Sequence, residues 1–150
     1  MKYLNKKAAL KLCSFVLLLL GVLDIIRGFT HTFRVRDAAE YLAKIEPTSD
    51  SLVLMSAFGI SNFLTGFLYF LIVFKAKKIT PYVLTIIPIS YMIGGLGMQY
   101  SNVILESEFR GQHMMKVYLA TCLFTALLYF IVTQIENKHK IKNNNFDKDN

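Results

Sequence analysis

Four long runs of apolar residues, separated by short polar stretches, dominate the chain. They cover residues 8–29, 52–74, 81–100 and 114–135. Each run approaches the roughly 20 residues that an α-helix needs to cross about 30 Å of hydrocarbon. Backbone N–H and C=O groups cannot stay unpaired in lipid, so helices are the expected solution for these runs. The pattern predicts an all-α fold in which residues 1–135 form an integral membrane four-helix bundle.

The polar stretch from residue 30 to residue 50 contains a weaker helical pattern. Its apolar residues recur at helical spacing: Ala38, Tyr41, Leu42 and Ile45. Charged residues fill the other face, and Glu40 with Lys44 forms a favourable i,i+4 pair. We predict a short amphipathic interfacial helix between the first and second spans, lying on the membrane surface or capping the bundle.

Small residues interrupt the second and third runs. In the second run they are Gly59, Ser61, Asn62, Thr65 and Gly66. Such residues favour close packing between membrane helices. In the third run, Pro88 is expected to bend the helix, because it removes an internal hydrogen bond. Three glycines follow it, Gly94, Gly95 and Gly97, and they either let a neighbouring helix approach closely or loosen this one.

The charges flank the apolar runs and predict the topology. The chain of 150 residues has a formal net charge of +7 and is 54% hydrophobic. Eleven lysines lie in the N-terminal stretch, the second loop and the tail, against five lysines and arginines in the two other loops. The positive-inside rule therefore places both termini in the cytoplasm. We expect an inner-membrane protein with no nucleic-acid partner, and a disordered cytoplasmic tail over residues 136–150.

The cysteines and histidines give no sign of a metal or redox centre. Cys13 and Cys122 each lie within an apolar run, and no CxxC motif is present. His113 falls in a loop without a second histidine or an acidic residue at metal-binding spacing. We therefore expect no metal site and no cofactor.

The most informative segment is LDIIRGFTH near the end of the first run. Asp24, Arg27 and His31 are spaced i, i+3 and i+7, so they share one face if the helix continues through Gly28. A lone charge near the bilayer centre costs about 2.5–3.5 kcal/mol, and pairing Asp24 with Arg27 reduces this cost. Such residues normally face the interior of a bundle or a water-filled cavity.

The four-span topology suggests neighbours for this segment. Gln99 should lie near His31 at the outer surface, and Asn62 should lie deeper. An outward-opening polar pocket floored by Asn62 would suit a lipid or quinone-like ligand. The candidate ligand-binding residues are Asp24, Arg27, His31, Asn62 and Gln99. The alternative is structural: Arg27 reaches the interface and the ion pair only holds the orientation of the helix.

The arrangement resembles the DoxX-like group of small four-helix bacterial membrane proteins. The shared points are the stretch Gly21-x-x-Asp24-x-x-Arg27-Gly28, the alanine-rich amphipathic segment and the NFLTG sequence at residues 62–66. Some members of that group are associated, as accessory subunits, with quinone or thiosulfate oxidation. The resemblance implies the same architecture along nearly the whole chain and an accessory role, and it transfers no individual functional residue.

Two functional hypotheses follow. The first is an accessory or ligand-binding membrane protein whose partners are membrane lipids, a lipid or quinone-like ligand, and another membrane protein or further copies of itself. The second is a membrane-embedded enzyme or a proton-coupled carrier that uses Asp24, Arg27 and His31. No motif identifies a catalytic residue.

Overall fold

A computed structural model describes residues 5–102 and 111–146, with the backbone alone at 111–112 and 140–146. Within these residues the secondary structure is entirely helical. The four long helices are α1 (Lys6–Phe33), α3 (Ser49–Lys75), α4 (Thr80–Tyr100) and α5 (Gly111–Phe146). All four contain a stretch long and apolar enough to cross a membrane, which confirms the prediction of a multi-pass all-α protein.

The first helix is longer than the apolar run that predicts it. Asn5 caps α1, because its side chain accepts a hydrogen bond from the backbone N–H of Ala8 at 2.8 Å. At the other end the helix passes through Gly28 without a break and stops at Phe33. Because the helix is continuous, Asp24, Arg27 and His31 share one face of α1.

Two short helical segments link α1 to α3. They are α2 (Val35–Asp37) and η1, a π-helical turn (Ala38–Ala43) that ends at Lys44 in the left-handed conformation, with φ 54°. The buried side is formed by alanines, whereas Tyr41 and Leu42 point outward and are 73% and 55% exposed. The predicted apolar face assumed 3.6 residues per turn, and the wider π turn places the side chains differently.

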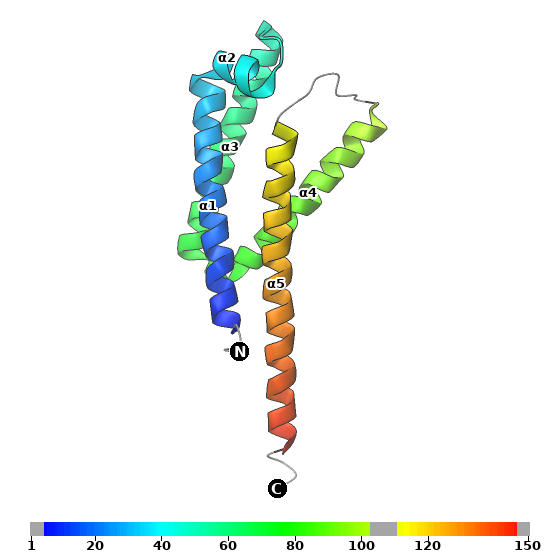
Figure 1. The fold of residues 1–150 in the computed structure, drawn as a ribbon. Helices are drawn as coiled ribbons and strands as arrows, with labels where there is room; N and C mark the ends of the chain where they lie inside the picture. Colours follow the sequence, from blue (N-terminus) through cyan, green and yellow to red (C-terminus); the bar gives the residue numbers. More distant parts are fainter. Residues whose placement is uncertain (1–4, 103–110, 147–150) are drawn as a thin grey trace.

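Helices α1 and α3 run antiparallel (Figure 1), and they contact each other at two pairs of glycines. A Cβ atom added to Gly66 would lie 3.0 Å from the carbonyl oxygen of Gly21, and one added to Gly28 would lie 3.0 Å from that of Gly59. A side chain at these positions would collide with backbone, so glycine sets the short separation of the two helices. The prediction that Gly59 and Gly66 serve helix packing is confirmed.

The apolar core lies toward the N-terminal end of α1, where α4 and α5 pack against it. Its fully buried side chains include Cys13, Leu17, Leu84 and Cys122, and both cysteines are free thiols. Beyond the core, the backbone N–H of Lys6 donates to the Glu136 carboxylate at 2.9 Å, which ties the start of α1 to α5.

Helix α4 begins after a short 3-10 turn, η2 (Lys77–Ile79), and only its first half is packed. Residues 89–102 are all exposed, and the second half of the helix diverges from α1 and α3 in Figure 1. The change occurs at Pro88, which has no N–H to bond to the Leu84 carbonyl. Cβ atoms added to the three glycines of this half would meet nothing within 4 Å. The described chain therefore provides no helix that packs against them.

Helix α5 continues through Phe146, past residue 135, where the predicted span ends. The structure thus places residues 136–146 in a helix, whereas the sequence predicts a disordered tail there. Extending an existing helix costs less free energy than nucleating a new one. The apolar span up to residue 135 can therefore continue as a helix into the polar residues that follow it. Residues 147–150 of the predicted tail lie outside the described residues.

Candidate functional site

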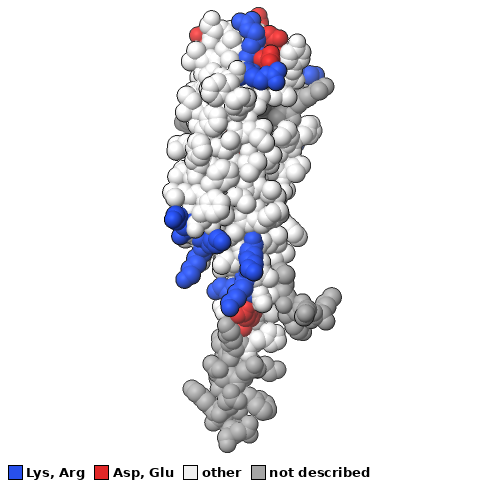
Figure 2. Space-filling view, turned by 90° about the vertical axis from the view of Figure 1, so that its left-hand side faces the viewer, with Lys and Arg blue, Asp and Glu red and all other residues white. Residues whose placement is uncertain are grey.

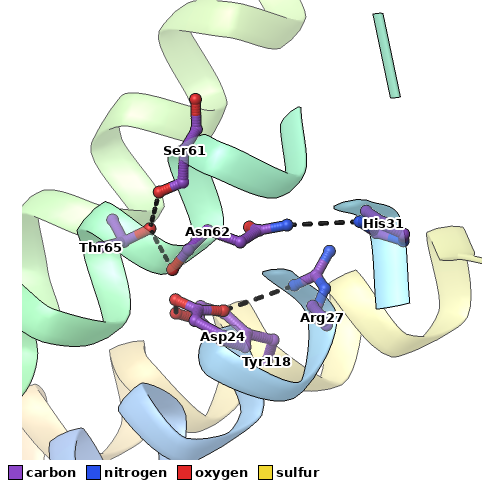
Figure 3. Close-up of polar contacts among 7 residues, drawn as sticks. All are labelled: Asp24, Arg27, His31, Ser61, Asn62, Thr65 and Tyr118. Carbon is purple, nitrogen blue, oxygen red and sulfur yellow. Dashed lines mark hydrogen bonds and ion pairs between the residues drawn. The ribbon is translucent and has the colours of Figure 1, made fainter. Parts of the chain in front are cut away.

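Five polar side chains from three helices lie together toward the Phe33 end of α1 (Figure 3). We call them the polar cluster: Asp24, Arg27 and His31 on α1, Asn62 on α3 and Tyr118 on α5. The unbroken course of α1 places its three members on one face. The sequence predicted four of the five as ligand-binding residues.

Asp24 is the most deeply buried charged residue among those described, with 4% of its surface exposed. Its Oδ1 lies 3.8 Å from an Nη atom of Arg27, which makes an ion pair too long for a hydrogen bond. Its Oδ2 accepts a hydrogen bond from the Tyr118 hydroxyl at 3.3 Å. The carboxylate therefore connects α1 to α5 and lies beside a positive charge on its own helix.

His31 and Asn62 form the second pair of the cluster. The Asn62 amide nitrogen lies 3.4 Å from His31 Nδ1, and Asn62 is 7% exposed. When the amide nitrogen donates, Nδ1 accepts, and the imidazole is then the neutral tautomer with its proton on Nε2. The pair therefore couples the tautomer of His31 to the orientation of the Asn62 amide.

Gly59 makes the second pair possible. A Cβ atom at Gly59 would lie 3.0 Å from both the carbonyl carbon and the Cβ of His31, and it would overlap the Thr32 hydroxyl. A larger residue would push α3 away from this part of α1. Asn62 follows Gly59 by three residues on α3. The close contact at Gly59 thus holds Asn62 within reach of His31.

The structure does not bring Gln99 to the polar cluster. Gln99 is exposed near the end of the diverging half of α4, and its backbone carbonyl accepts a hydrogen bond from Asn102 N–H at 3.1 Å. In the described part of the chain, no contact joins its side chain to Asp24 or His31. The sequence argument placed Gln99 there by assuming that all four helices stay together to their ends, which α4 does not do.

Tyr118 is the member that sequence reasoning missed, because its place near the start of the fourth run favours the aromatic belt at the membrane interface. The sequence did contain one clue, the predicted depth of Tyr118 in the membrane. Tyr118 lies a few residues inside the start of the fourth run, and Asp24 lies a similar distance inside the end of the first run, on the same side. Which face of α5 turns toward Asp24 depends on helix rotation.

The chemical groups of the cluster are suited to hydrogen bonding and proton transfer. It combines a carboxylate, a phenol, a guanidinium, an imidazole and an amide, drawn from three helices. No group of three His, Cys, Asp or Glu side chains that could hold a metal ion occurs among the described residues.

Comparison of the chain with protein-family models, with curated proteins and with solved structures returns no match. Fold and site together define a multi-pass α-helical membrane protein with a partly buried polar cluster between three of its helices.

Proposed function

We propose that this chain is a small inner-membrane protein that binds a lipid or quinone-like ligand at the polar cluster, as an accessory component beside another membrane protein or further copies of itself. In this proposal the four helices form a bundle in the membrane, both termini are cytoplasmic, and α2 with η1 lies at the outer surface. The resemblance to the DoxX-like group supports the accessory role.

The proposal rests on how few contacts the Arg27 guanidinium makes with the described residues. A guanidinium has five N–H donors. Arg27 makes no hydrogen bond to any described residue, and its one partner is Asp24 at 3.8 Å. Its side chain is 26% exposed, so an incoming molecule can reach it. Ionisable residues inside a membrane mark functional sites by default, and this one has N–H donors that no described residue satisfies.

The test compares two arginines that each pair with an aspartate three residues away on the same chain. Arg27 pairs with buried Asp24, whereas Arg34 pairs with exposed Asp37 at 2.7 Å. The full chain is purified in lipid nanodiscs, and retained small molecules are identified by mass spectrometry. We expect Arg27→Gln to reduce retention of a bound amphiphile about tenfold, and Arg34→Gln to leave it unchanged. Equal retention by both variants would contradict the proposal.

A second candidate function, an enzyme or proton-coupled carrier, is favoured by the Tyr118–Asp24 hydrogen bond. That bond places two protonatable groups from different helices in contact, with Arg27 and His31 beyond them along α1. This candidate expects Asp24→Asn to abolish transport or turnover while the protein still inserts and folds. Turnover of a lipid or quinone substrate by the purified protein alone would favour it over the accessory role.

A further inference from the structure

The formal charges of the polar cluster sum to zero. Asp24 and Arg27 are opposite charges 3.8 Å apart, and the Tyr118 hydroxyl stabilises the carboxylate by hydrogen bonding to it. With the Asn62 amide nitrogen as the donor, His31 is the neutral tautomer and adds no charge. The other titratable groups near Asp24 are phenols and a thiol, which are uncharged at neutral pH. They are Tyr69, Tyr91 and Cys122.

The hydrogen-bonding capacity that remains in the cluster is mostly donating. The N–H groups of Arg27 have no acceptor among the described residues, and the Nε2–H of His31 lies one helical turn further along α1. The Asp24 oxygens already face Tyr118 and Arg27. A ligand that fits this arrangement presents acceptor oxygens to two donors.

An anionic head group would disturb this balance. It would satisfy the donors. However, the charges of Asp24 and Arg27 already cancel each other, so the anion would leave one uncompensated negative charge. The membrane interior solvates such a charge poorly. A carbonyl oxygen satisfies the same donors without adding charge. Building on the proposed function, we propose that the cluster selects amphiphiles with an uncharged, carbonyl-bearing head and discriminates against carboxylates of the same chain length.

The experiment uses two probes that differ in charge and little else, dodecanoate and methyl dodecanoate. Binding to the purified full chain is measured at neutral pH by native mass spectrometry. We expect the wild-type protein to bind the ester at least tenfold more tightly than the carboxylate. Arg27→Gln should remove most of the ester binding, and Arg34→Gln should leave it unchanged.

A second variant tests the charge argument directly. Asp24→Asn keeps the shape of the side chain but removes its negative charge, so Arg27 becomes an uncompensated cation. We expect the preference to reverse, with dodecanoate now bound more tightly than the ester. Circular dichroism and gel filtration check that the variant is folded, and the wild-type comparison stands without it.

The outcomes separate this inference from the proposed function. Tighter binding of dodecanoate than of the ester by the wild type, lost in Arg27→Gln, would overturn the inference and leave a ligand site in place. If the protein bound neither probe and retained no amphiphile in nanodiscs, both the inference and the proposed function would be wrong. An ester preference that Asp24→Asn does not change would also overturn the charge argument.

Discussion

The single residue that most constrains this molecule is Asp24. A carboxylate with 4% of its surface exposed would be very costly alone in lipid. Arg27 offsets the charge and Tyr118 donates a hydrogen bond, so the carboxylate has contacts on two helices. The same residue can therefore stabilise the fold and set the charge of a ligand site, and these two roles respond differently to substitution.

At this scale we predict that Asp24→Ala destabilises the protein by about 3 kcal/mol, because it leaves the Arg27 charge without its partner. Changing both residues to apolar ones should recover most of this loss. Asp37→Ala, which removes the exposed partner of Arg34, should cost at most about 0.5 kcal/mol. Unfolding by SDS in mixed micelles measures all three. A double variant as unstable as Asp24→Ala would show that the pair does not stabilise the fold in this way.

Among the elements, α1 and α3 contrast with α4 in how they use glycine. The four glycines of the α1–α3 contact meet opposing backbone or side chains within about van der Waals distance. Cβ atoms added to those in the second half of α4 meet no described atom within 4 Å. The residue type is the same in both places, so the structural role of each glycine depends on whether a neighbouring helix packs against it.

We therefore predict opposite results for one substitution at two sites. Gly66→Leu forces a side chain against the Gly21 carbonyl and should destabilise the protein by about 1–3 kcal/mol. A Cβ atom at Gly95 meets no described atom within 4 Å, so Gly95→Leu should leave stability within about 0.5 kcal/mol of the wild type. The same unfolding assay measures both. An equal loss at Gly95 would show that another helix covers this part of α4 in the membrane.

On the scale of the whole molecule, charge is distributed unevenly between the two ends. In Figure 2, mostly basic side chains gather in the lower part of the described surface, with an acidic patch beside them, while basic and acidic ones mix at the upper end. The lower end joins the start of α1, the end of α3 and η2, with Lys6, Lys7, Lys75, Lys77 and Lys78. Lysine-rich loops stay on the cytoplasmic side during insertion.

This asymmetry predicts the orientation of the chain in the membrane. Alkaline phosphatase fused after Asn150 should be inactive, because it stays in the cytoplasm, and the same enzyme inserted after Thr48 should be active. Green fluorescent protein at the two positions should give the reverse pattern. Active phosphatase at the C-terminus would contradict the proposed topology, and with it the outward position of the polar cluster.

Some of this architecture follows from the sequence alone, because it depends on local properties of the chain. Apolar runs of about 20 residues determine four helices long enough to cross a membrane. Helical periodicity determines that Asp24, Arg27 and His31 share a face, and their spacing already indicates the ion pair. These features need no knowledge of which helix neighbours which.

The tertiary structure decided the remainder, because it depends on how separate helices rotate and slide against one another. Contact between the α1 and α3 glycines sets the register that brings Asn62 to His31. The rotation of α5 turns Tyr118 toward Asp24. The divergence of α4 after Pro88 carries Gln99 away from the cluster. Apolar helices pack in many registers with similar hydrophobic patterns, so side-chain fit between helices, which the linear pattern does not record, selects one of them.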